Sequence, residues 1–163
     1  MFENYINDQD MIKVWHEIDL VFDQMMTPEL AGAAKEHGKY FKSGKGYFTS
    51  SYMAKFVLPT INSFAERVKF NGDHSVLVNY YGDGDYYHEH TDASIKTMVI
   101  FLSKGSNTFT GGDFRLSEIN TTIPFKHNSC ILFPSSMKHE VTTVHLNNTT
   151  PKMGRFSLTY FFK

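Results

Sequence analysis

The sequence lacks most of the features that mark secreted, membrane-bound or nucleic-acid-binding proteins. Its one cysteine, Cys130, cannot form an internal disulfide, which favours a reducing compartment. No apolar run is long enough to cross a bilayer, and the N-terminus lacks the basic and then apolar segments of a signal peptide. Lys and Arg total 16 against 17 Asp and Glu, so we expect no nucleic-acid or membrane partner. The composition therefore predicts a cytoplasmic enzyme or binding domain.

No linker, repeat or low-complexity segment divides the 163 residues, which predicts a single domain over 1–163. Residues 1–70 have a mainly helical pattern. Apolar residues recur at three- and four-residue steps between Asp8 and Met25, and a second helix with capping signals at both ends is predicted over 27–38. A third helix is expected after Pro59. Residues 40–52, which contain glycine and lysine, are expected to form a solvated turn, a hairpin or a flap over a pocket.

From residue 75 to residue 163 the chain consists of short β-branched and aromatic runs separated by Gly, Asn, Pro and Ser clusters. The runs are SVLVNYY, IKTMVIFLS, DFRLSE, SCILFPS, HEVTTVHL and RFSLTYFF. Many short strands at this spacing predict a sandwich, a barrel or a jelly roll. The 15 Phe and 9 Tyr suit a β-rich core and a pocket with rigid walls. The pattern as a whole predicts helices first and then an all-β core.

Residues 80–92, YYGDGDYYHEHTD, concentrate histidines and carboxylates, either as a polar turn or as half of a metal site. His90 and Asp92 are two apart on an extended segment, so their side chains point the same way. His139, at the start of another predicted strand, is a candidate third ligand. Two imidazoles and one carboxylate form the facial triad of non-haem Fe(II) oxygenases, whereas structural zinc usually has four protein ligands. The alternative is a zinc hydrolase site made of His88, His90 and His139.

Arg155 stands in the apolar run RFSLTYFF near the end of the chain. A guanidinium in an apolar strand is costly unless it meets a carboxylate, and its planar fork binds a carboxylate through two hydrogen bonds. The carboxylate can belong to an acidic side chain of this protein or to a small ligand. The sequence leaves both possibilities open.

Taken together, these motifs resemble the prolyl 4-hydroxylase-like branch of the Fe(II)- and 2-oxoglutarate-dependent dioxygenases. NYYGDGDYYHEHTD resembles that family's Tyr-Gly-x-Gly-x-x-Tyr-x-x-His-x-Asp segment, and FTGGDFRL resembles its Gly-Gly turn. ILFPSSMKHEVTTV resembles the distal-histidine strand, and GRFSLTYFF the strand that carries the basic residue for the cosubstrate. The resemblance covers roughly residues 75–163. It implies an α+β fold with a double-stranded β-helix (jelly-roll, cupin-like) core and N-terminal supporting helices.

The resemblance also implies roles for individual residues. His90, Asp92 and His139 match the iron ligands of the family. Arg155 matches the residue that binds the far carboxylate of 2-oxoglutarate. The further pocket residues implied are Tyr81, Ser157 and Thr97 on the cosubstrate side, and Tyr87 and His88 on the substrate side.

The implied activity is hydroxylation of a C–H bond, with a prolyl residue in a peptide or protein as the favoured substrate and with release of succinate and CO2. The implied cofactors are Fe(II), 2-oxoglutarate as cosubstrate, O2, and ascorbate as reductant. The alternatives are the same chemistry on a free amino acid or another small molecule, and a non-catalytic metal-binding cupin-like module. Phe101 departs from the family, because several prolyl hydroxylases have a tyrosine there that reaches the cosubstrate. Thr97 or Ser157 is expected to compensate.

Overall fold

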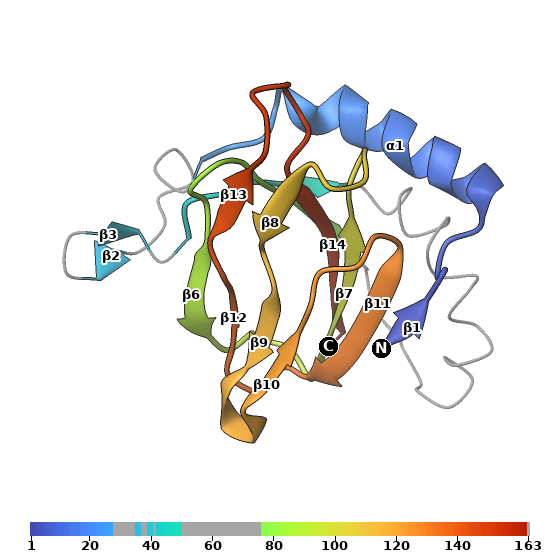
Figure 1. Ribbon diagram of the computed structural model, residues 1–163. Helices are drawn as coiled ribbons and strands as arrows, with labels where there is room; N and C mark the ends of the chain where they lie inside the picture. Colours follow the sequence, from blue (N-terminus) through green and yellow to red (C-terminus); the bar gives the residue numbers. More distant parts are fainter. Residues whose placement is uncertain (28–34, 37–38, 41, 50–75, 163) are drawn as a thin grey trace.

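The computed structural model describes residues 1–27, 35–36, 39–40, 42–49 and 76–162 (Figure 1). This part of the chain contains the helix α1 (Asp8–Phe22) and the 3-10 helix η1 (Ser117–Ile119). The third helix predicted after Pro59 lies outside the described residues. The strands are β1 (Phe2–Glu3), β2 (Lys35–Glu36), β3 (Lys39–Tyr40), β4 (Lys45–Thr49), β5 (Val76–Tyr81), β6 (Tyr87–His90), β7 (Lys96–Leu102), β8 (Phe109–Gly111), β9 (Phe114–Leu116), β10 (Thr121–Ile123), β11 (Ser129–Pro134), β12 (His139–Val141), β13 (Val144–Leu146) and β14 (Arg155–Phe162).

Two antiparallel sheets face each other and form a jelly roll. The larger sheet has the strand order β1-β11-β7-β14-β5-β4, and the smaller sheet has the order β10-β9-β12-β6. Strands β13 and β8 form a separate pair, as do β2 and β3. In Figure 1 strands β12 and β9 lie in front of β14 and β7, with the interior of the roll between them. This arrangement confirms the predicted α+β fold with a jelly-roll core.

Strand β14 divides its side chains between the two faces of the larger sheet. Phe156, Leu158 and Tyr160 are buried in a core that also contains Val14 and Ile18 of α1. The intervening polar residues, Arg155, Ser157 and Thr159, line a pocket on the other face. Because side chains alternate along a strand, one eight-residue run can support a core on one side and supply polar groups to a cavity on the other.

Helix α1 covers the outer face of the larger sheet. The side chain of Asn7 accepts a hydrogen bond from Asp10 N at 3.0 Å and so caps the first turn. On the buried side of the helix, the Trp15 ring lies edge-on against Phe156, with centroids 5.3 Å apart. The predicted first helix is confirmed. Among the described residues, no helix has the length and apolar character that a membrane span requires.

The N-terminal third differs from the prediction in two places. The helix predicted over 27–38 is wrong at Lys35 and Glu36, which form β2 and pair with β3; residues 28–34 and 37–38 lie outside the described residues. Lys45–Thr49 of the segment 40–52 is neither a solvated turn nor a separate hairpin. It forms β4, the edge strand of the larger sheet, and pairs with β5.

The predicted strand HEVTTVHL is two strands with different partners. β12 pairs with β6 and β9, whereas β13 pairs with β8. The chain changes partner at Thr142 and Thr143, where the Thr142 hydroxyl accepts a hydrogen bond from Asp113 N at 2.9 Å and Thr143 O accepts one from Gly112 N at 3.2 Å. Hydrophobic pattern alone did not reveal this change, because both halves have the alternation of a strand.

Candidate metal centre

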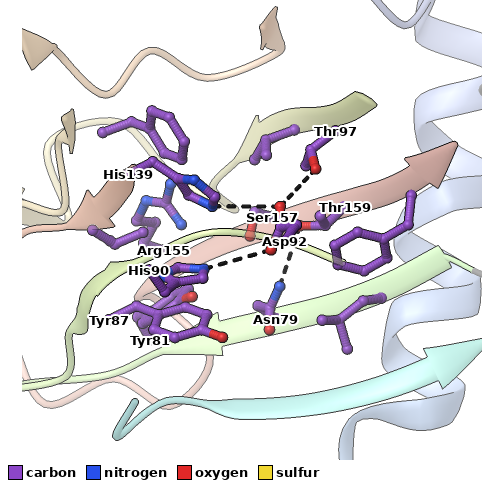
Figure 2. A pocket seen from close by; sticks show the side chains of 15 residues that line it. Asn79, Tyr81, Tyr87, His90, Asp92, Thr97, His139, Arg155, Ser157 and Thr159 are labelled. Atoms are coloured by element: carbon purple, nitrogen blue, oxygen red, sulfur yellow. Dashed lines mark hydrogen bonds and ion pairs between the residues drawn. The ribbon is translucent and has the colours of Figure 1, made fainter. Parts of the chain in front are cut away.

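Three potential metal ligands meet between the ends of two strands. His90 is the last residue of β6, His139 is the first residue of β12, and the two are cross-strand neighbours in the smaller sheet. Asp92 follows β6 two residues after His90. One ligand atom from each side chain lies within 4.8 Å of the others, and Figure 2 shows both imidazoles directed at the carboxylate. The structure thus brings together the three residues singled out from the sequence.

The hydrogen bonds of the two imidazoles direct their other ring nitrogens at Asp92. His90 Nδ1 lies 2.8 Å from His88 O, and His139 Nδ1 lies 2.8 Å from Met137 O. Because a carbonyl oxygen only accepts, each Nδ1 carries the proton, and each neutral ring has a lone pair on Nε2. These Nε2 atoms lie 3.7 and 3.4 Å from the carboxylate oxygens of Asp92. Lone pairs facing a carboxylate repel it, so the arrangement fits a cation bound between them.

The Asp92 carboxylate is fixed by a chain of hydroxyl groups. Thr97 Oγ1 donates to Asp92 Oδ2 at 2.6 Å and lies 2.8 Å from Ser135 Oγ. Ser135 Oγ in turn lies 2.6 Å from Ser94 Oγ, and Asp92 N donates to Ser135 O at 2.9 Å. The Thr97 hydroxyl, which the resemblance implied for the cosubstrate, is therefore placed on the carboxylate. Such outer hydrogen bonds orient a ligand and hold its free oxygen toward the centre.

Burial keeps the His90 imidazole uncharged. Desolvation, with a smaller effect of the neighbouring His139, lowers the pKa of His90 to about 4, so this ring is neutral at physiological pH. The Tyr87 ring stacks on His90 with centroids 3.7 Å apart. Phe133 lies edge-on against His139, with centroids 4.8 Å apart, and Phe114 stacks on its ring at 5.3 Å. Aromatic side chains thus shield both rings from water, and neutral imidazoles are the form that binds metal.

Arg155 lies deep in the same pocket and has no acidic partner in the described part of the chain. The residue is 1% exposed, and only Nε is paired, donating to Gly112 O at 2.8 Å. Neither Nη1 nor Nη2 has a hydrogen-bond partner among the described residues. Burial lowers the pKa of Arg155 to about 10, so it is still charged at physiological pH. A buried cation with two free amino groups fits a bound carboxylate, and the internal salt bridge considered from the sequence is not found there.

Aromatic rings and a glycine pair hold the guanidinium in place. Its Cζ lies 5.1 Å from the ring centroids of both Tyr81 and Phe101. Gly111 and Gly112 have positive φ angles of 69° and 68°, and a Cβ at Gly112 would lie 2.8 Å from Arg155 Cδ. The Gly-Gly turn noted in the sequence therefore gives the arginine room while offering it a carbonyl oxygen.

One pocket connects the arginine with the histidine–aspartate cluster. Of the nine site residues predicted from the sequence, His88 is absent from its lining. His88 contributes its carbonyl oxygen to His90 but does not belong to the cluster of ligand atoms, which disfavours the zinc site of His88, His90 and His139. The predicted residues that do line the pocket are Tyr81, Tyr87, His90, Asp92, Thr97, His139, Arg155 and Ser157.

Sequence analysis did not single out three further groups at this pocket. Asn79 and Thr159 line it, and Asn79 Nδ2 donates to Thr159 Oγ1 at 3.4 Å. Lys42 also reaches it, because its ammonium donates to Asn79 Oδ1. The glycines of the segment KSGKG were the available signal, since Gly44 and Gly46 both lie close to β5 side chains.

Comparison with known proteins assigns the family. The sequence profile of the 2OG-Fe(II) oxygenase superfamily matches residues 76–163, more than half of the chain. No curated protein matches the sequence at a significant level. The chain therefore belongs to the 2OG-Fe(II) oxygenase superfamily and is a 2-oxoglutarate-dependent dioxygenase, as the motifs predicted. Membership implies Fe(II), 2-oxoglutarate and O2 as reactants or cofactors.

Solved structures with the same fold include several members of this superfamily. A prolyl-4-hydroxylase from Pseudomonas putida is 15% identical and has a TM-score of 0.72, over 99% of this chain and 89% of that one. The viral collagen prolyl hydroxylase of Paramecium bursaria Chlorella virus-1, in complex with 2OG, is 12% identical, with a TM-score of 0.61 over 98% and 92%. A 2OG-Fe(II) oxygenase family oxidoreductase from Burkholderia pseudomallei is 16% identical, with a TM-score of 0.58 over 91% and 78%. At these identities the likeness concerns the fold.

Proposed function

We propose that this dioxygenase holds Fe(II) with His90, Asp92 and His139, binds 2-oxoglutarate with Arg155, and hydroxylates a prolyl residue in a peptide or protein. The observation that carries the proposal is the pairing of two incomplete groups in one pocket. One is a set of neutral imidazole and carboxylate ligands without a cation, and the other is a buried guanidinium without an anion. Fe(II) and a diacid complete both.

The residues around the site do the positioning. When bound, Fe(II) and 2-oxoglutarate supply the oxidative chemistry that reduces O2, releases succinate and CO2, and adds one oxygen atom to a substrate C–H bond. Arg155 grips the far carboxylate and so fixes the orientation of the cosubstrate before reaction. Thr97 holds the Asp92 carboxylate, and the carbonyl oxygens of His88 and Met137 fix the tautomers of the histidines. Aromatic walls exclude water.

A prolyl substrate is supported by the apolar side of the pocket next to Asp92. Phe161 is the cross-strand neighbour of Thr97, and both line the pocket, as does Leu77. Phe48, which is 60% exposed, is the cross-strand neighbour of Leu77 and extends this apolar surface outward along β4. A pyrrolidine ring is compact and apolar, and it suits such a wall. The titles of two structural relatives name prolyl hydroxylases, which favours the same class.

The proposal is tested by adding Fe(II) and 2-oxoglutarate to the purified protein and measuring succinate. A panel of prolyl peptides, with free proline and other free amino acids in parallel, is then screened for the mass gain of one oxygen atom. We expect succinate formation that depends on Fe(II), with oxygen added to proline within a peptide. Oxygen added only to a free amino acid would show that the substrate is a small molecule rather than a peptide. No succinate with any panel member would contradict the assignment of the site.

Two further parts of the proposal concern the reductant and the location in the cell. Ascorbate is proposed as the reductant that keeps iron in the Fe(II) state, so its omission should shorten the period of linear turnover. A cytoplasmic location is proposed from the single cysteine, which is buried and unpaired. Cell fractionation with a tagged form of the protein tests the proposed cytoplasmic location.

A further inference from the structure

Lys42 belongs to a segment that closes one side of the jelly roll. It lies between β3 and β4, outside the residues matched by the family profile. Ser43 N donates to Tyr86 O at 3.1 Å, Tyr86 N donates to Ser43 Oγ at 3.0 Å, and Lys42 forms a β-bridge with Tyr87. These bonds join the edge of the larger sheet to β6 of the smaller one, so the segment becomes part of the wall around the pocket.

The Lys42 side chain lies against the wall of the pocket. Its ammonium donates to Asn79 Oδ1 and lies 5.7 Å from the ring centroid of Tyr81 and 5.6 Å from that of Tyr87. All three of these residues line the pocket. Gly46 leaves the space that the ammonium occupies, because a Cβ at Gly46 would lie only 3.1 Å from Lys42 Nζ.

This position lies between the two ends of the proposed cosubstrate site. Tyr81 is the ring that packs against the Arg155 guanidinium, and Tyr87 is the ring that stacks on His90. Among the residues that the structure describes, no carboxylate forms an ion pair with Lys42. Asp85 acts on it from beyond ion-pair distance, and its contacts are an amide oxygen and two aromatic faces. Arg155 lines the pocket, Lys42 lies against three of its lining residues, and Asp92 is the only carboxylate of the described lining.

The charges point to a dianionic ligand. A partly buried ammonium that lacks a carboxylate is costly, and a second cation nearby raises that cost. 2-Oxoglutarate carries two carboxylates, of which Arg155 is assigned the far one. The other carboxylate, at the oxo-acid end, would meet the Fe(II) held by His90, Asp92 and His139, and no cationic side chain of the jelly-roll core in the described lining gives it a further contact. Lys42 is the cation placed to serve it.

We propose that Lys42 is a second cationic anchor of 2-oxoglutarate, supplied by the N-terminal segment and acting on the carboxylate at the oxo-acid end. The inference rests on the proposed cosubstrate site at Arg155. It adds a residue from outside the family-matched region to that site. It also makes cosubstrate affinity depend on how the segment before β4 docks against β6.

The test is the affinity for 2-oxoglutarate, measured by calorimetry with Fe(II) under anaerobic conditions and without any peptide. Lys42→Met removes the charge and keeps most of the side-chain volume. Since a hydrogen bond to a charged group is lost, we expect binding to weaken by about tenfold or more. Lys45→Met is the matched control, because Lys45 lies over the Phe22 ring, on the α1 side of the sheet. This control should bind like the wild type.

Thermal melting without cosubstrate separates binding from folding. Lys42→Met should melt close to the wild type, because the lost hydrogen bond to Asn79 is offset by removal of a partly buried charge that has no ion-pair partner among the described residues. If the wild type binds 2-oxoglutarate and Lys42→Met binds it equally well, Lys42 is not an anchor, and a carboxylate of the primary substrate becomes the remaining candidate partner. If the wild type itself does not bind, the proposed site fails, and the inference fails with it.

Discussion

The two ends of the pocket are incomplete in opposite ways. At the metal end, His90, Asp92 and His139 are each held by a hydrogen bond, and together they present lone pairs and one negative charge. At the other end, Arg155 is held by Gly112 and three aromatic rings and presents a positive charge with two free amino groups. The first end fits a cation and the second an anion. The folded protein is thus prepared for a metal and a diacid together, at a cost to the stability of the ligand-free state.

The largest effect is expected from His139→Ala, which breaks the metal end alone. Loss of this buried imidazole, 4% exposed, would leave only two of the three proposed ligands. Metal affinity should then fall more than ~100-fold, since even groups that only hydrogen-bond to metal ligands typically contribute 10- to 100-fold to the affinity. Calorimetry with Fe(II) under anaerobic conditions measures this loss, and succinate formation should cease. The exposed His145 gives the control His145→Ala. Turnover retained by His139→Ala would show that this histidine is not a ligand.

Arg155→Met should disrupt the cosubstrate end of the pocket and leave the metal end intact. Affinity for 2-oxoglutarate is expected to fall by ~30-fold or more, as for truncation of one member of a buried charged pair, with metal affinity unchanged. The ligand-free variant should melt no lower than the wild type, because an unpaired buried charge is removed. Arg115→Met removes an exposed arginine, paired with Glu140, as the control. Equal losses of metal and cosubstrate binding would contradict the division between the two ends.

Thr97→Val tests which end Thr97 serves. The hydroxyl lies 2.6 Å from Asp92 Oδ2, so its loss should weaken metal binding by about tenfold and change cosubstrate binding less. Both affinities are measured by the same calorimetry, with Thr122→Val at an exposed position of β10 as the control. Weaker 2-oxoglutarate binding with unchanged metal affinity would return Thr97 to the cosubstrate role that the family resemblance implied.

The smallest effect concerns pH and sharpens the contrast between the two cations. Burial lowers the pKa of Lys42 to about 8, against a smaller opposing effect of Asp85, whereas burial lowers the pKa of Arg155 only to about 10. Lys42 is therefore charged below about pH 8 and neutral above it, while Arg155 stays charged. Affinity for 2-oxoglutarate should fall as the pH rises through about 8 in the wild type. In Lys42→Met it should be nearly constant over that interval, and equal pH dependence in both proteins would exclude Lys42 as the cause.

The C-terminal strands and the cluster of His90, Asp92 and His139 were predictable because the signals for them are largely local. The alternation in RFSLTYFF, the His-x-Asp spacing and the Gly-Gly turn each act within a few residues, and the strand Arg155–Phe162 has the bounds predicted from its sequence. The resemblance supplied the pairing of His139 with His90, which the local pattern does not contain. Their ring centroids lie 4.2 Å apart because β12 pairs with β6.

What escaped prediction depends on contacts between distant segments. The alanine-rich pattern of residues 27–38 favours a helix, yet Lys35 and Glu36 pair with β3, so tertiary context overrides propensity. Lys42 lies against Asn79 because the segment before β4 forms a bridge with Tyr87 of β6, a contact without a sequence motif. Thr97 lines the pocket, but its bond to Asp92 depends on the turn after β6.

The central claim is that one cation and one diacid complete the two ends of a single pocket. The most direct test is a crystal structure of the protein with Fe(II) and 2-oxoglutarate, prepared anaerobically, with anomalous scattering recorded at the iron edge. We predict an iron peak among His90 Nε2, His139 Nε2 and the Asp92 carboxylate, and a ligand carboxylate on Nη1 and Nη2 of Arg155. Iron bound elsewhere, or a guanidinium that makes no contact with the diacid, would contradict the account.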